Sequence, residues 1–160
     1  MNYTIRNATV RDAKGCYLLF KSVVFEDIFL VTSAEEFHST PSNKAQIIDH
    51  HVKSPNSSYF VCTHNSEVIA MTSILGGFFQ RTEHVGQLEI YVREDYRSKG
   101  IGRKMLTKAI EWSKDNSIIR KVSLSVFWDN QKAIKIYRRL GFKDEALLKG
   151  EFMERDGKLR

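Results

Sequence analysis

Residues suited to binding phosphate gather in one short segment, EDYRSKGIGRKML. Gly100 and Gly102 lack a Cβ atom, so an anion can approach the main chain closely. Arg97, Lys99 and Arg103 add positive charge around them. A helix-like stretch follows, and free N–H groups at a helix start favour anions. The pattern therefore indicates a phosphate cradle, although the same residues also fit a basic helix start whose glycines serve only the turn.

Two common phosphate loops do not match this segment. The pattern GxxxxGK[ST] is absent from the chain, and GxGxxG fails because Met105 occupies the position of its third glycine. Chemistry of the NTPase kind is therefore not expected.

Hydrophobic periodicity predicts the elements that position this loop. A strand over residues 84–92 precedes it, and the helix that follows has Ile101, Met105 and Ala109 on one face. The predicted elements in chain order are strand 3–8, helix 13–25, helix 43–52, a hairpin around 64–66, strand 84–92, helix 99–116, strand 121–126, helix 131–140, and two short strands around Asp156-Gly157. This order predicts a mixed α/β sheet with helices on its faces.

Length and composition indicate one globular domain over residues 1–160. Apolar runs are too short for a membrane-spanning helix, and the N-terminus has no apolar core like that of a signal peptide, so we expect a cytoplasmic protein without a membrane partner. Cys16 and Cys62 lack metal-ligand spacing, and we expect both to be buried and no metal to be bound. The net charge of +6 suggests a polyanionic partner, either nucleic acid or a phosphorylated cofactor.

Two motifs in order carry a family resemblance. The loop RSKGIG follows the strand LEIYV, and NQKAIKIYRRLGF comes later in the chain. Together they resemble the acetyl-CoA-binding signature of the GNAT family of N-acetyltransferases, over about residues 70–142. The resemblance implies a GNAT fold: a mixed, mostly antiparallel sheet of about six to seven strands, flanked by about four helices and splayed at the cofactor-binding strand.

The resemblance also implies that acetyl-CoA is the acetyl donor. Loop amides would bind its pyrophosphate, and the end of the preceding strand would pair with its pantetheine arm as with an added strand. The implied cofactor-binding residues are Ile90, Tyr91, Val92, Arg97, Ser98, Lys99, Gly100, Ile101, Gly102, Arg103 and Asn130. Asn130 could equally be the N-cap of the next helix.

Two catalytic residues are implied. Tyr137 matches the tyrosine that protonates the leaving thiolate in many members, although such a residue could also be core packing. Glu89 is the first candidate for the base that deprotonates the amine, unless strand alternation points it to solvent. Glu83 and His84 are substitutes near the other end of the same strand.

The expected function is transfer of an acetyl group to a primary amine by direct attack on the thioester. The acceptor is a small molecule or a peptide, such as an amino acid, a small amine or a protein N-terminus. We expect residues 25–56 and 78–84 to determine which acceptor is used. A non-catalytic acyl-CoA-binding module is the alternative; a nucleic-acid-binding protein is disfavoured because no recognition motif accompanies the charge. The sequence stops at Arg160, soon after the predicted Asp-Gly turn, so either the last strand is short or the chain ends early. A homodimer, which is frequent in the family, could complete that edge.

Overall fold

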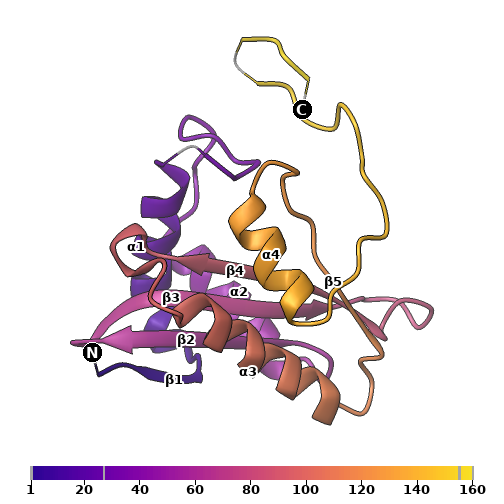
Figure 1. Ribbon diagram of the computed structural model, residues 1–160. Helices are drawn as coiled ribbons and strands as arrows, with labels where there is room; N and C mark the ends of the chain where they lie inside the picture. Colours follow the sequence, from indigo (N-terminus) through magenta and orange to yellow (C-terminus); the bar gives the residue numbers. More distant parts are fainter. Residues whose placement is uncertain (1, 27, 155, 160) are drawn as a thin grey trace.

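In this computed structural model, helices form two layers around one sheet (Figure 1). The structure describes residues 2–26, 28–154 and 156–159, which contain nine regular elements. They are β1 (Thr4–Asn7), α1 (Ala13–Val24), α2 (Pro41–Lys53), β2 (Ser58–His64), β3 (Glu67–Gly76), β4 (Val85–Val92), α3 (Ile101–Asp115), β5 (Lys121–Ser123) and α4 (Gln131–Arg139). Short 3-10 turns lie at Val10–Asp12 and Glu94–Tyr96. No helix in these described ranges has both the length and the apolar character needed to span a bilayer.

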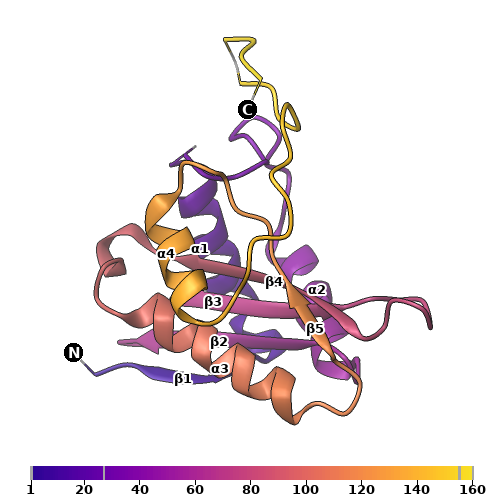
Figure 2. The same cartoon turned by 45° about the vertical axis from the view of Figure 1, so that its right-hand side comes forward.

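The sheet has the order β1-β2-β3-β4-β5, with every pair antiparallel except β4 and β5. Helices α1 and α2 cover one face, and α3 and α4 lie on the other (Figures 1 and 2). Each face has its own apolar cluster, one with Met105 and Leu106 of α3 and the other with Leu19 of α1 and Ile48 of α2. The predicted mixed α/β sheet with helices on both faces is therefore confirmed.

Local signals set most element boundaries. Helix α2 begins at Pro41 because the Thr40 hydroxyl accepts from the Asn43 N–H at 3.1 Å, while the Asn43 side chain accepts from the Thr40 N–H at 3.0 Å. Asn65 and Ser66 both have positive φ, at 48° and 65°, as the tight turn between β2 and β3 requires. The predicted helices are thus present, with ends that differ by one or two residues.

Strand β4 presents its side chains alternately to the two helix layers. Leu88, Ile90 and Val92 contact the cluster beneath α3, whereas Tyr91 contacts the cluster beneath α1 and α2. Since successive strand side chains face opposite sides, Glu89 lies on the α1–α2 face with Tyr91. The side chains of β4 therefore contribute to both apolar clusters, one on each face of the sheet.

The prediction of about six to seven strands is wrong, because the sheet of the described residues has five. The predicted C-terminal pair is reduced to one isolated bridge, Met153 with Leu159, around a turn in which the Gly157 N–H donates to the Glu154 carbonyl at 2.8 Å. In Figures 1 and 2 this tail rises away from the sheet. The turn chemistry was therefore predicted correctly, but the tail pairs with itself and adds no strand to the sheet.

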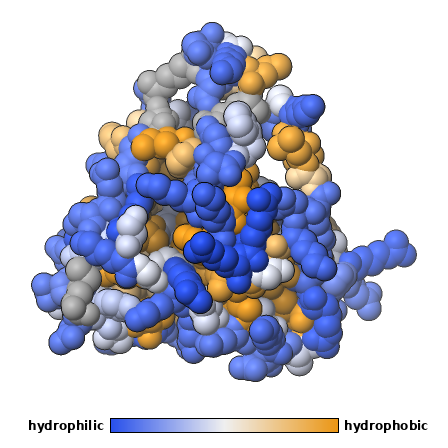
Figure 3. Space-filling view, viewed as in Figure 1, coloured by the Kyte–Doolittle hydropathy of each residue, from blue (hydrophilic) through white to orange (hydrophobic). Residues whose placement is uncertain are grey.

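Much of the tail's apolar surface remains exposed. Leu147, Leu148 and Met153 are all more than half exposed. Figure 3 shows a largely hydrophilic face, with apolar atoms gathered near the α1–α2 connection and along the tail. The Phe152 ring of the tail lies 5.0 Å from the ring of Phe127, which precedes α4.

Candidate active site

The loop before α3 holds main-chain donors that no other described group uses. None of the N–H groups from Ser98 to Arg103 donates to a protein acceptor within the described ranges, whereas the Lys104 N–H donates to the Gly100 carbonyl at 3.2 Å. Gly100 and Ser98 have φ of +79° and +59°. Left-handed residues among helical ones turn successive N–H groups toward one side and form anion-binding nests. The arrangement therefore suits a phosphate group.

Gly102 is not required by the packing of the protein. A Cβ atom there would meet Val92 Cγ2 at 3.6 Å and Ile90 Cδ1 at 3.9 Å, both ordinary contacts, and its φ is not left-handed. In contrast, a Cβ atom on Gly15 would lie only 2.6 Å from Val68 Cγ2. Close approach of a ligand to the main chain is a reason for glycine at position 102 that packing does not supply.

Two of the three cations expected around the glycines are held by protein groups. The Arg97 guanidinium donates from Nε to the Val92 carbonyl at 2.9 Å and pairs with Glu26 at 2.6 Å. The Lys99 ammonium donates to the Asp95 carbonyl at 2.7 Å. Arg97 thus ties the loop to β4 and to the end of α1, while Arg103 forms no ion pair with any described residue.

Strand β4 loses its outer neighbour halfway along its length. Strand β5 pairs only with Val85–Gln87, so the predicted strand 121–126 is shorter than its alternation suggested. The Val85 carbonyl and the Arg93 N–H both bond toward β3. Because the backbone groups of alternate residues point to opposite neighbours, those of Ile90 and Val92 point to the open side. There the Arg97 side chain donates a hydrogen bond to the Val92 carbonyl. The predicted splay is present, and the edge can accept an extended chain.

Helix α4 borders this open edge on the α3 face (Figure 1). Its N-cap is Asn130, whose side-chain oxygen accepts from the Ala133 N–H at 3.2 Å. The Asn130 amide NH₂ donates to no described group, so the capping role leaves it available to a ligand. No residue of α4 is fully buried, although Ile136 and Leu140 contact the α3-side cluster. The apolar face of α4 is therefore only partly covered by the protein.

Tyr137 lies on that apolar face of α4. Its ring is half-buried against the α3-side cluster and lies 5.9 Å from the ring of Phe142. Burial raises the pKa of its hydroxyl above the usual value. The hydroxyl consequently remains protonated near neutral pH and can donate a proton.

The chemistry of the loop, the open edge and α4 suits the parts of acetyl-CoA. Unused N–H groups suit its diphosphate, unpaired strand groups suit the amides of its arm, and a partly covered apolar face suits the methylene groups between them. Ile101 can contribute only its N–H group, because its side chain is buried in the core. The loop from Ser98 to Arg103, the open edge at Ile90 and Val92, and Asn130 therefore remain predicted cofactor contacts, whereas the Tyr91 side chain lies on the α1–α2 face.

A cavity of about 550 Å³ lies on the opposite face, between α2 and the sheet. It is lined by Asn43, Lys44, Gln46, Ile47, His50, His51, Tyr59, Ser73, Leu75, Phe78, Gln87, Glu89 and Tyr91. Both segments expected to determine the acceptor contribute to it. Its volume is in the range of small-molecule sites.

Glu89 lines this cavity, and its side chain is also exposed to solvent. The Tyr91 hydroxyl donates to Glu89 Oε2 at 3.2 Å. Burial, followed by the charge of Glu89, raises the pKa of the Tyr91 hydroxyl, which keeps it a donor. Glu83 and His84, which lie in the loop before β4, do not line the cavity. Glu89 is therefore the carboxylate placed between the cavity and the open strand edge.

Two buried polar residues of the cavity were missed from the sequence. Lys44 and His51 are only 7 % and 6 % exposed. They share the inner face of α2 with Ile48, at positions i, i+4 and i+7. This spacing was the available signal, because it places a lysine and a histidine on the apolar stripe of a helix.

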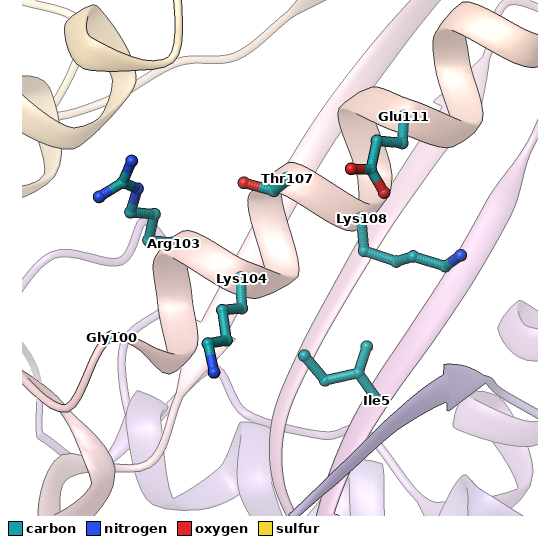
Figure 4. A pocket seen from close by; sticks show the side chains of 7 residues that line it. All are labelled: Ile5, Gly100, Arg103, Lys104, Thr107, Lys108 and Glu111. Atoms are coloured by element: carbon teal, nitrogen blue, oxygen red, sulfur yellow. The ribbon is translucent and has the colours of Figure 1, made fainter.

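A second hollow, of about 610 Å³, runs along the outer surface of α3 toward β1 (Figure 4). It is lined by Ile5, Gly100, Arg103, Lys104, Thr107, Lys108 and Glu111. Strand β1 is at the opposite edge of the sheet from β5. This hollow therefore extends toward the edge of the sheet opposite the splay, and Gly100 and Arg103 of the loop before α3 line it.

Comparison with known proteins shows the family and the fold of the chain. The model of the acetyltransferase (GNAT) family matches residues 24–142. An acetyltransferase of the GNAT family from Streptococcus pneumoniae has a similar structure, with a TM-score of 0.94, 25 % identity, and coverage of 99 % of this chain and 94 % of that chain. The predicted family resemblance, the GNAT fold and the acyltransferase class are confirmed.

Similar sequences include enzymes with different acceptors. An uncharacterized N-acetyltransferase of Methanocaldococcus jannaschii is 33 % identical over 62 % of this chain and 45 % of its own length. An L-amino acid N-acetyltransferase of Escherichia coli is 30 % identical over 46 % and 49 %. A spermine/spermidine N(1)-acetyltransferase of Bacillus subtilis is 25 % identical over 65 % and 84 %. The chain thus spans about half the length of the first two. Of these three relatives, one is named for an amino acid as acceptor and one for polyamines.

Proposed function

Because the chain belongs to the GNAT family of acetyltransferases, we propose that it transfers the acetyl group of acetyl-CoA to the primary amine of a small molecule. The observation that carries this proposal is the loop Ser98–Arg103, whose unused N–H groups lie beside the open edge of β4. When bound there, acetyl-CoA supplies an acetyl thioester as the electrophile. The cavity on the α2 side receives the amine.

Glu89 acts as the base in this proposal. An amine must be neutral to attack, and removing the proton from a lysine-type amine at pH 7 costs about 4–5 kcal/mol, against about 1 kcal/mol for an α-amine. Glu89 lines the cavity and lies on the strand with the open edge. It accepts the ammonium proton directly or through a water molecule, while the Tyr91 hydroxyl holds its carboxylate in place.

Tyr137 acts as the acid. As the carbon–nitrogen bond forms and the carbon–sulfur bond breaks, the sulfur leaves as a thiolate. Burial raises the pKa of the Tyr137 hydroxyl, which is therefore protonated at neutral pH and donates its proton to that thiolate. The acetylated nitrogen releases its surplus proton to solvent, and a proton from solvent restores the phenol. Base and acid lie on opposite faces of the sheet, one on β4 and the other on α4.

A binding and turnover experiment tests the proposal. We expect acetyl-CoA to bind with a stoichiometry of one per chain, and thiol release to depend on added amine across a panel of amino acids, polyamines and peptides with free N-termini. Absence of acetyl-CoA binding would contradict the cofactor site. Binding without amine-dependent release would instead identify a non-catalytic acyl-CoA-binding module.

Replacing the base gives a sharper result. We expect Glu89→Gln to lower kcat by about 10²-fold at neutral pH, the usual contribution of general base catalysis. The loss should shrink as pH rises, because a growing share of the amine is then already neutral. The measurement is a pH profile of kcat from pH 6 to 10.

The matched control for this variant is Glu83→Gln, which removes an exposed carboxylate outside the cavity. It should leave kcat within twofold. If Glu89→Gln behaves like Glu83→Gln at every pH, Glu89 is not the base.

A further inference from the structure

Lys44 is a largely buried lysine that forms no direct ion pair with a described carboxylate. Burial lowers the pKa of its ammonium, and the charge of Glu89 partly offsets this effect. The Lys44 side chain is 7 % exposed, and within the described ranges it forms no ion pair or hydrogen bond through Nζ. The ammonium lies 4.5 Å from the centre of the Phe20 ring. Burying a charge is costly unless an opposite charge compensates it. Lys44 therefore offers a site to an anion from outside the chain.

The backbone around Lys44 reinforces this preference. Lys44 lies in the first turn of α2, which begins at Pro41. The helix dipole makes the N-terminal turn favourable for an anion and unfavourable for a cation. An isolated lysine is therefore poorly placed here, whereas a lysine that binds a carboxylate is well placed.

Lys44 and Glu89 are joined by a short series of contacts. The Phe20 ring packs edge-on against the Tyr91 ring with centroids 5.1 Å apart, and the Tyr91 hydroxyl donates to Glu89. Among the described residues that line the cavity, Lys44 is the only lysine or arginine and Glu89 is the only acidic residue. The cavity thus contains one lysine and one carboxylate, together with the imidazoles of His50 and His51.

His51 adds a hydrogen-bond acceptor without adding charge. Its Nδ1 lies 2.7 Å from the Ile47 carbonyl, so Nδ1 carries the proton and Nε2 keeps its lone pair. Burial is the main cause that lowers the pKa of the imidazole, which keeps it neutral at neutral pH. Lys44 consequently remains the group suited to pair with a carboxylate.

We propose that the acceptor is a compact amine that also carries a carboxylate, of the α-amino-acid type, with its carboxylate held by Lys44 and its amine directed to Glu89. This inference rests on the proposed acetyl transfer and names the substrate class of that site. A polyamine is disfavoured, because a second ammonium group would face Lys44. The cavity of about 550 Å³ holds one such molecule.

The first test uses the unmodified enzyme. Each L-amino acid is compared with its own α-carboxamide, and spermidine is included. We expect kcat/KM for the preferred amino acid to exceed that of its carboxamide by about tenfold or more, as a charge-assisted hydrogen bond predicts. The amine of the carboxamide loses its proton more easily, so intrinsic reactivity cannot produce this preference. Equal or better use of the carboxamide, or preference for spermidine, would overturn the inference.

The second test removes the cation. Lys44→Met should bring the ratio of acid to carboxamide close to one, with the KM for acetyl-CoA unchanged, while Lys44→Arg should retain a preference for the acid. The matched control is Lys53→Met on the same helix, since Lys53 is exposed and pairs with Asp49 at 2.7 Å. Lys53→Met should leave the ratio unchanged. A full acid preference in folded Lys44→Met would overturn the inference.

Competition with a substrate analogue and binding of acetyl-CoA complete the test. If circular dichroism shows that Lys44→Met is unfolded, competition with the desamino analogue of the preferred amino acid decides: inhibition competitive with the acceptor supports a carboxylate site, and absence of inhibition opposes it. If acetyl-CoA binds and amines are acetylated without regard to a carboxylate, only this inference fails. If acetyl-CoA does not bind, the proposed function fails as well.

Discussion

Tyr137→Phe is expected to lower kcat by about 10²-fold or more while changing the KM for acetyl-CoA by no more than twofold. The ring keeps its place against the α3-side cluster and near Phe142, so binding and folding are preserved. Only the hydroxyl is lost, and general acid catalysis contributes about 10²–10⁴-fold. Steady-state kinetics with saturating amine measure the effect.

The pH dependence of this variant carries additional information. Burial raises the pKa of Tyr137, so the hydroxyl of the unmodified enzyme stays protonated across the neutral range and its loss should be felt at every pH from 6 to 9. Tyr3→Phe is the control, because Tyr3 is half-buried just before β1, at the far edge of the sheet. A kcat for Tyr137→Phe equal to that of the control would remove Tyr137 from the mechanism.

Gly102→Ala is expected to weaken acetyl-CoA binding by about tenfold or more without destabilising the fold. The new methyl group meets only Val92 and Ile90 at ordinary contact distances. Alanine within a helix is favoured over glycine by up to about 1 kcal/mol. The free energy of unfolding should therefore stay constant or rise, while the methyl group stands where a phosphate oxygen approaches the main chain. Calorimetric titration and urea unfolding measure the two quantities.

Gly100→Ala provides the contrasting case. Its Cβ atom would touch nothing within 4 Å, but the residue has φ of +79°. Left-handed backbone costs a non-glycine residue about 1–2 kcal/mol, so this variant should lose stability. If Gly102→Ala binds acetyl-CoA as tightly as the unmodified protein, the main chain at position 102 does not contact the phosphates.

The proposed cofactor surface could be predicted from the sequence because it depends on local features. Gly100 and Gly102 sit at the start of a helix that periodicity alone predicts, and the alternation of β4 fixes which residues face each layer. The capping role left open for Asn130 is observed, and it is compatible with a ligand role. Such features involve residues a few positions apart, which is the range that pattern reasoning covers.

The acceptor side could not be predicted from the sequence, because it depends on contacts between distant parts of the chain. Lys44 is buried because α2 packs against α1, including the Phe20 ring, and against strands that come later in the sequence. Arg97 looked like a phosphate ligand, yet its guanidinium pairs with Glu26, far away in the sequence. Spacing cannot reveal which partner a charged side chain meets when that partner lies on another element.

By itself, the sequence determined the order of the elements, the glycine-rich helix start and the family to which they belong. Only the tertiary structure decided that β5 leaves β4 after Ser123, that the tail adds no strand, and that Lys44 and Glu89 share a cavity. The physical reason is that periodicity records which side of an element is apolar. It does not record where a neighbouring strand departs or which charges the packed elements enclose.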